Sequence, residues 1–322
     1  MIKTVKTQDI KTGMYVVLPK KWFAHPFLKN EFLITSPEQI VKLLEARIVE
    51  VSIDTAKSTF PEQKAQIQIS PKVKTIPLPI IPPSLHEAIY DKKMPAEEKA
   101  KAIHKYSIEM MHRLMERPSA ESIKEAKKGI SEVVDLILAD DKTNQQLLSI
   151  TSHDYNTYVH SVNVGVLGVS LAKTIFRRSD AHNMHELGAG FFLHDLGKVK
   201  VDINIIIKPA RLTDMEMQEM QRHAQYGYEI LTDTHQLTEE CKKIVLQHHE
   251  RENGTGYPQK LYGDAIHVYG RICSIADVFD ALVSDRPYKE KLGPFDALKV
   301  MKEEMLNHFH KQLFEKFVLL FK

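Results

Sequence analysis

The sequence predicts a mainly α-helical protein that carries a small α+β domain at its N-terminus. From residue 85 onward, apolar residues recur with the period of helices that bury one face, and no convincing strand pattern follows residue 150. Before residue 68, short apolar runs alternate with polar residues, as in strands. Between these parts, five prolines within residues 71–83 indicate an extended linker.

The α+β domain is predicted over residues 1–68. GMYVVLP, at residues 13–19, is typical of a short strand bounded by turn-forming residues. Residues 32–54 predict a strand, a helix and a strand, because Ser36 can cap the helix, Pro37 suits its first turn and IVEVSI alternates apolar and polar residues. We expect this domain to regulate the protein, contact a second subunit or bind a protein partner; the alternative is a passive structural cap.

The linker is predicted over residues 69–84 and connecting helices over residues 85–149, ahead of a large domain at residues 150–322. Two apolar stripes define the connecting helices, with Pro118 between them. The stripes are Ala100, Ile103, Ser107, Met110 and Leu114, then Ile123, Ala126, Ile130, Val133 and Ile137. These helices either pack on the large domain or form a homodimer.

The composition is that of a globular protein and excludes some partners. A formal net charge of +2 over 322 residues gives no strong attraction to a nucleic-acid polymer or an anionic membrane. The N-terminus lacks an apolar signal segment, and the stretch from Val162 to Phe176 is interrupted by polar residues, so no membrane span is expected. The two cysteines form no disulfide framework, which fits a cytoplasmic location.

Two pairs of adjacent ionisable residues lie beside apolar runs. They are His194-Asp195 in FFLHDLGKVK and His248-His249 in IVLQHHERENGTGYP. Burying an unpaired carboxylate or imidazole is costly, and a bound metal ion removes that cost. The two pairs therefore predict a metal site held between helices.

Further candidate ligands lie in other apolar helical segments. His160 and His223 are ambiguous alone, because a histidine on an apolar face is more often a core residue. Asp277, an acid within RICSIADVFDALVS, requires a partner. Asp195 suits a bridging role, since its two oxygens can hold two cations. Lys198, one turn later, would hold a phosphate oxygen near the ions; the alternative is a buried ion pair with Asp195.

Histidine and carboxylate ligands without thiolates favour iron or manganese over a structural zinc. Two such ions a few ångströms apart can share a hydroxide and polarise a phosphoryl group, which is the two-metal route to cleavage of phosphate esters. A second histidine pair, His182 and His185, has polar neighbours and no third ligand nearby in sequence. We expect that pair to lie on the surface.

These motifs together resemble the HD-GYP branch of the HD superfamily of metal-dependent phosphohydrolases. Five segments match in order: DYNTYVHSVNV, HDLGK, the histidine of QRHAQYG, HHERENGTGYP and RICSIADVFDALVSDRPYK. The resemblance covers residues 150–322 and implies an HD-type helical bundle. The N-terminal domain is similar to a small uncharacterised domain often found before HD-GYP domains.

The resemblance also implies roles for individual residues. The metal ligands would be His160, His194, Asp195, His223, His248, His249 and Asp277. Lys198 would contact the scissile phosphate, Gly256, Tyr257 and Pro258 form the GYP loop, and Asp154, Arg286 and Lys289 would face guanine. Some members of the family have a glutamate where this chain has Asn156, a poorer ligand, so we expect two metals rather than three.

The implied activity is hydrolysis of the bacterial second messenger cyclic di-GMP to pGpG, GMP or both, through a hydroxide that bridges the metals. Two alternatives stay open at this point. The preferred substrate could be 3′3′-cGAMP, which differs by one purine base. The chain could instead bind cyclic di-GMP, or recruit a partner through the GYP loop, without hydrolysis.

Overall fold

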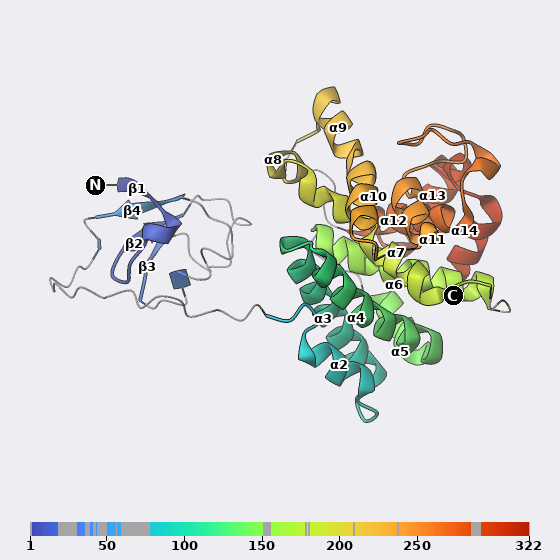
Figure 1. The fold of residues 1–322 in the computed structure, drawn as a ribbon, viewed down its shortest axis with the longest axis horizontal. Coiled ribbons are helices and arrows are strands. Elements are labelled where there is room, and N and C mark those ends of the chain that lie inside the picture. The colour runs from blue at the N-terminus through green and yellow to red at the C-terminus, as the bar shows by residue number, and fades with distance from the viewer. Residues whose placement is uncertain are drawn as a thin grey trace. The chain divides into compact units, whose positions relative to one another are not determined.

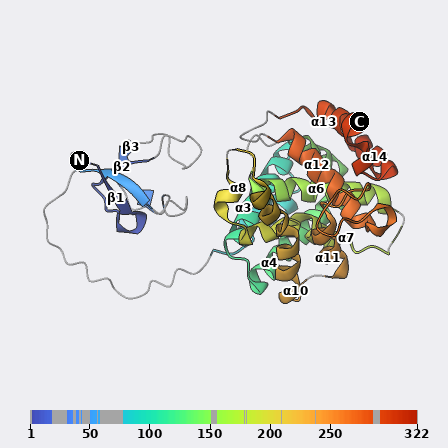
Figure 2. The same cartoon turned by 90° about the horizontal axis from the view of Figure 1, so that it is seen from above.

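The computed structural model describes residues 2–18, 31–35, 39–40, 43, 50–55, 57–58, 78–150, 156–177, 179, 181–208, 210–236, 238–284 and 291–321. The chain divides into two compact units, residues 1–76 and 77–322, which Figures 1 and 2 show from two directions. Each unit has its own hydrophobic core. The predicted class, a mainly helical protein with a small N-terminal α+β domain, is confirmed.

The N-terminal unit is built on a four-stranded antiparallel sheet. Its strands are β1 (Ile2–Lys6), β2 (Tyr15–Val17), β3 (Glu31–Leu33) and β4 (Glu50–Asp54), in the order β1-β4-β2-β3. Three of these strands lie where the sequence predicts them, whereas β1 was not predicted because IKTVK lacks a strict apolar alternation. Of the predicted helix after Ser36, the described residues 39, 40 and 43 are helical, and the others lie outside the described residues.

The connecting helices belong to the helical unit. They are α2 (Pro83–Tyr90), α3 (Ala96–Glu116), α4 (Ala120–Ala139) and α5 (Asp141–Ser149). Both predicted stripes are fully buried, packed against each other and against later helices of the same chain. A homodimer would therefore need other surfaces. Pro83 starts α2, where a proline is tolerated because the first helical N–H has no partner within the helix, and residues 69–77 of the predicted linker lie outside the described residues.

The remaining helices follow along the chain after residue 156. They are α6 (Thr157–Phe176), α7 (Met184–Leu193), α8 (Ile203–Ile206), α9 (Asp214–Gln221), α10 (His223–Asp233), α11 (Glu239–Gln247), α12 (Val268–Val283), α13 (Pro294–Glu304) and α14 (Lys311–Val318), with the 3₁₀ helix η2 (Leu196–Lys200) after α7. Among the described residues after 150 there is an isolated bridge between Asn253 and Tyr262 but no strand, as predicted. The helices α6 and α7 lie at the centre, in contact with α3, α4, α11 and α12 (Figure 1).

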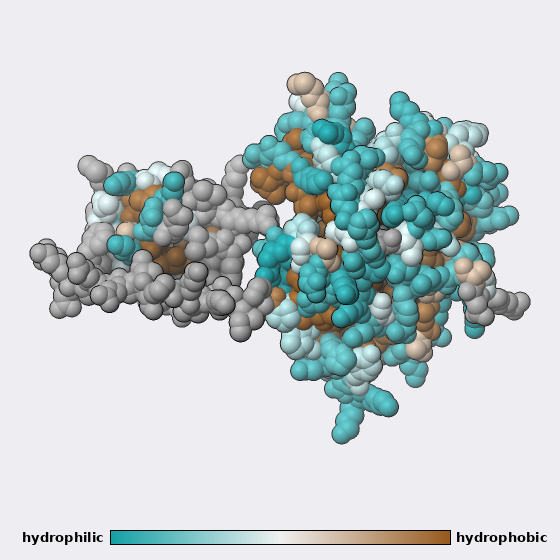
Figure 3. Space-filling view, viewed as in Figure 1, coloured by the Kyte–Doolittle hydropathy of each residue, from teal (hydrophilic) through white to brown (hydrophobic). Residues whose placement is uncertain are grey.

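The central helix α6 is long and apolar enough to cross a membrane by composition, with a mean hydropathy of 1.3. However, 78% of this stretch is buried inside the helical unit, which is typical of a core helix. The face of the unit shown in Figure 3 is mainly hydrophilic, with smaller apolar patches. The apolar residues of α6 are therefore used for packing.

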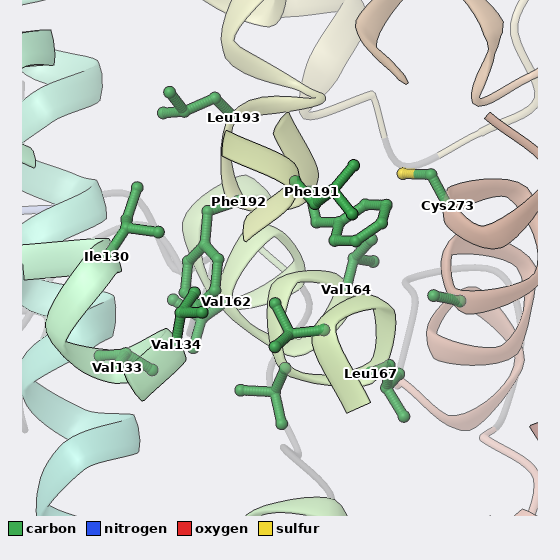
Figure 4. Packing of buried hydrophobic residues seen from close by; sticks show 14 of the residues in the cluster. Ile130, Val133, Val134, Val162, Val164, Leu167, Phe191, Phe192, Leu193 and Cys273 are labelled. Carbon is green, nitrogen blue, oxygen red and sulfur yellow. The ribbon is translucent and has the colours of Figure 1, made fainter. Parts of the chain in front are cut away.

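Two glycines let α6 and α7 approach closely. A Cβ atom at Gly168 would lie 2.8 Å from the ring of Phe191, and one at Gly165 would overlap the ring of Phe192. Figure 4 shows both rings among Val162, Val164 and the residues of α4 that close this layer. Both phenylalanines are completely buried, so neither ring can move into solvent.

We predict that Gly165→Ala destabilises the protein, although alanine favours a helix by about 1 kcal/mol over glycine. The reason is that overpacking a buried interface typically costs about 1–3 kcal/mol. Urea unfolding of this variant should give a lower midpoint than that of the parent protein. Thr174→Ala, at an exposed position of the same helix, is the control and should shift the midpoint little. A Gly165→Ala variant that is as stable as the parent protein would contradict this account of the packing.

Candidate metal centre

Three candidate ligands share one local geometry at the ends of helices. His194 follows α7, His248 follows α11, and His223 lies two residues after the end of α9. In each case Nδ1 donates a hydrogen bond to the carbonyl oxygen three residues earlier, at 2.8 Å, 2.8 Å and 2.6 Å respectively. The helix end thus fixes each ring and leaves Nε2 pointing away from its own helix.

This geometry makes Nε2 an acceptor. A carbonyl oxygen cannot donate, so each Nδ1 carries the proton, and a neutral imidazole then has a lone pair at Nε2. Burial lowers the pKa of His194, His223 and His248 to about 4, which keeps them neutral near pH 7. The Nε2 atoms of His223 and His248 lie 3.2 Å apart. Two lone pairs at this distance repel each other unless a cation lies between them.

Asp195 lies between two sets of these side chains. Its Oδ1 is 3.3 Å from Nε2 of His223 and 3.9 Å from Nε2 of His248. Its Oδ2 is 3.6 Å from Nε2 of His194 and 3.7 Å from Nε2 of His160. One carboxylate therefore faces two groups of imidazoles, one with each oxygen.

Asp277, in the middle of α12, reaches both groups in the same way. Its Oδ1 lies 2.9 Å from Nε2 of His160, and its Oδ2 lies 3.4 Å from Nδ1 of His249. His160 lies near the start of α6, and both residues are buried. Two helices, α6 and α12, and the ends of three others, α7, α9 and α11, thus converge on one point.

The structure brings all seven predicted ligands together. They form two adjacent groups, Asp195, His223, His248 and His249 in one and His160, His194 and Asp277 in the other, with ligand atoms within 4.8 Å of one another inside each group. Among the described residues, His194 Nε2 and Asp195 Oδ1 are buried without a hydrogen-bond partner. Such orphaned atoms are expected where a cation binds, and the C-terminal ends of α7 and α11 add partial negative charge. The donor set therefore fits divalent metal ions.

Lys198 forms the ion pair that the sequence left as an alternative. Its Nζ lies 2.5 Å from Oδ2 of Asp195, and its side chain is only 13% exposed. Burial alone would raise the pKa of Asp195, but the positive charge of Lys198 holds it well below its usual range. The lysine thus places a positive charge directly beside the two groups.

The GYP loop presses against the second ionisable pair. Gly256 does not have a positive φ; it is required because a Cβ there would collide with the backbone of residues 249–251. The backbone N–H of Tyr257 donates to the carbonyl oxygen of His249 at 3.2 Å, and the two rings lie 4.6 Å apart. The tyrosine ring therefore covers one side of His249 at the rim of the site.

Sequence reasoning missed two buried acids. Glu250, 1% exposed, accepts hydrogen bonds from the backbone N–H groups of Gln259 and Leu261 and so fixes the far end of the GYP loop. Its polar neighbours in the sequence gave no signal. Asp280, 2% exposed, accepts a hydrogen bond of 2.7 Å from Nδ1 of His160. Like Asp277, Asp280 is an acid within the apolar segment RICSIADVFDALVS, so the sequence carried the same signal for both residues.

Several predicted residues are not part of the described site. Asp154, Arg286 and Lys289 lie outside the described residues, so their contact with guanine stays a prediction. Asn156 caps α6 by accepting from the backbone N–H of Val159, a structural role that suits asparagine.

The other histidine pair does not join the cluster. His185 is exposed, as expected, and pairs with Asp135. His182 is half-buried, because it stacks on Phe176 and bonds to the hydroxyl of Tyr269. The expectation that both histidines lie on the surface was therefore only partly right.

Comparisons with known proteins agree with this architecture. A model of the HD domain matches residues 142–313, and one of a domain of unknown function, DUF3391, matches residues 2–138. The chain also shares its fold with Bd1817, an HDG"Y"P protein from Bdellovibrio bacteriovorus, at a TM-score of 0.63 and 16% identity over 98% of both chains.

Similar sequences include proteins named as cyclic-dinucleotide phosphodiesterases. A cyclic di-GMP phosphodiesterase of Pseudomonas aeruginosa is 31% identical over 99% of this chain and 76% of its own length. A 3′3′-cGAMP-specific phosphodiesterase of Vibrio cholerae is 42% identical over 38% of this chain and 24% of its own length. The HD model matches more than half of the residues, and the Pseudomonas enzyme is similar over nearly the whole chain. The chain therefore belongs to the HD domain family, in its HD-GYP branch.

Proposed function

We propose that the protein is a metal-dependent phosphodiesterase that hydrolyses cyclic di-GMP. The observation that carries this proposal is the position of Asp195, whose two oxygens each face a separate group of imidazoles. A carboxylate in this position could hold one divalent ion with each of its oxygens, and two such ions would supply the chemistry of a two-metal phosphodiesterase. The choice of substrate rests on the similarity to the Pseudomonas enzyme.

Each group of residues contributes to cleavage. When bound, two such ions supply Lewis-acid polarisation of the phosphoryl group and a nucleophile at neutral pH. Lys198 adds a fixed positive charge for the phosphoryl oxygens, where charge accumulates in the transition state. Tyr257 offers a ring and a hydroxyl at the rim, and the guanine bases would be held by Asp154, Arg286 and Lys289. The expected products are pGpG, GMP or both.

The nitrogen and oxygen ligands favour iron or manganese, and we propose two ions. A third ion would need a ligand at Asn156, whose side chain is used in capping α6. We further propose that the protein acts in the bacterial cytoplasm. Its N-terminal unit would serve regulation or partner binding, and the GYP loop would be a second contact for a protein partner.

A second candidate substrate is 3′3′-cGAMP. The observation that favours it is the 42% identity to a 3′3′-cGAMP-specific enzyme over 38% of the chain. The two substrates differ in one base, so the discrimination depends on polar groups around the pocket rather than on the metal ligands.

The first prediction is that protein loaded with Fe(II) or Mn(II) under anaerobic conditions converts cyclic di-GMP into linear products. Chromatography of the products would separate pGpG from GMP, and parallel reactions with 3′3′-cGAMP would give the preference. Faster turnover of 3′3′-cGAMP would keep the chemistry and change the substrate. Tight binding without product, in protein whose metal content has been verified, would indicate a receptor and contradict the proposal.

Asp195→Asn should reduce the metal content from two ions per chain to one or fewer and lower turnover by more than about 100-fold. The asparagine keeps the shape of the side chain but loses the charge and one ligand oxygen. A ligand that bridges both ions should matter more than an outer partner, whose loss costs about 10–100-fold. Asp214→Asn, at an exposed position in the first turn of α9, is the control. Full metal content measured by elemental analysis in Asp195→Asn would exclude the bridging role.

Lys198→Met should retain both metals and lose about 100- to 1,000-fold in kcat, as is typical when one group that stabilises developing charge is removed. The methionine preserves the apolar part of the side chain. Lys200→Met changes a neighbouring lysine of η2 that is 44% exposed, and it should leave kcat near that of the parent protein. Loss of metal from Lys198→Met would show that the lysine supports the ligands instead.

A further inference from the structure

A chain of hydrogen bonds leads from the metal centre to a helix outside the HD match. It starts at His160, whose Nδ1 bonds to Asp280 at 2.7 Å. The other oxygen of Asp280 accepts from the side-chain amide of Asn163 at 2.7 Å. The carbonyl oxygen of that amide lies 2.8 Å from Nε2 of His104. His104 belongs to α3, within the residues that match DUF3391.

The direction of every bond in this chain follows from its acceptors. Asp280 is a carboxylate and can only accept, so both Nδ1 of His160 and Nδ2 of Asn163 donate to it. The remaining amide atom of Asn163 is then its oxygen, so Nε2 of His104 must carry a proton and donate. Turning the amide around would place its oxygen against the carboxylate of Asp280, which is unfavourable. Nε2 of His160 faces Oδ1 of Asp277 at 2.9 Å. Because Nδ1 keeps its proton for Asp280, Nε2 is the atom that would give up its proton and offer a lone pair to a metal ion.

His160 is therefore held differently from the other histidines described above. His194, His223 and His248 are oriented by backbone carbonyls at helix ends. His160 lies inside α6, where the carbonyls are used within the helix, and it depends on a carboxylate. A carboxylate partner fixes the ring and strengthens the imidazole as a ligand.

The outer part of this chain borders a small cavity. A cavity of about 20 Å³ is lined by His104, Asn163, Asp280, Leu147, Val166 and Phe279, among others. Its lining combines three members of the chain with apolar side chains from α5, α6 and α12. Beside this cavity, the amide of Asn163 is held from one side by the hydrogen bond from His104 and from the other by its bond to Asp280.

We propose that His104 is a positioning residue of the metal centre, which acts through Asn163 and Asp280 to orient His160. The helix α3 would thereby belong to the outer shell of the site, although it lies outside the residues that match the HD domain. This inference rests on the metal centre of the proposed function but not on which cyclic dinucleotide is cleaved.

The test is a direct measurement of metal binding by the full chain, without any substrate. His104→Leu should weaken the binding of Mn(II) by about 10-fold in competition with a chelator, as is typical for the loss of an outer-shell partner. The absorption spectrum of the Co(II)-loaded variant should change, because the ligand field depends on the orientation of His160. His104→Gln can place an N–H near the position of Nε2 and should restore both properties.

Two further variants make the outcome decisive. His104→Asn is too short to reach Asn163 and should behave like His104→Leu, which keeps the test available if the leucine variant does not fold. His86→Leu, at an exposed histidine of α2, should leave metal binding unchanged. Equal losses in the Gln and Asn variants would indicate a packing effect and overturn the proposal, as would normal Mn(II) affinity and an unchanged Co(II) spectrum in His104→Leu. Because no substrate is used, an inactive parent protein that binds metal would refute the proposed function and leave this test intact.

Discussion

The structure depends on the compensation of one buried carboxylate, Asp195. An ion taken out of water costs several kcal/mol, on the order of what a protein domain has in total stability, unless opposite charge and hydrogen bonds surround it. Here Lys198 provides one positive charge at 2.5 Å, and the surrounding imidazoles are neutral. The remaining compensation is left to cations. The same arrangement that is costly without metal therefore favours the binding of cations.

The rest of the helical unit holds the ligands around that carboxylate. Three histidines are fixed by the carbonyls at helix ends. Two further ligands lie within helices, His160 near the start of α6 and Asp277 near the middle of α12. This requires the helices to meet at close range, which is why α6 has glycines where the phenylalanines of α7 pack. The geometry of the site thus depends on the packing of the core, because a shift of α6 against α7 would move His160 away from Asp195.

The boundary between the two matched domains does not coincide with the boundary between the compact units. The DUF3391 match runs to residue 138, whereas the helical unit begins at residue 77. The helices α2 to α4 therefore belong to the DUF3391 match, but they pack in the core of the helical unit. These helices supply part of the hydrophobic core of the helical unit. The hydrogen bond between His104 and Asn163 also connects α3 to the residues around the metal centre. The N-terminal sheet has a separate core and is joined to this unit through the proline-rich segment.

The sequence by itself determined the helical class, the apolar stripes of α3 and α4 and the candidate ligands, because burial patterns and costly polar residues are visible along the chain. Motif order added the family, and with it His160 and His223, which look like ordinary core histidines on their own. Only the tertiary structure decided that Asp195 faces one group with each oxygen, that Asp280 supports His160, and that Glu250 fixes the GYP loop. These relations join residues on different helices or across a loop, up to 120 positions apart. Periodicity records which side of a helix is buried, but it does not record which side chain will be on the other side of the contact.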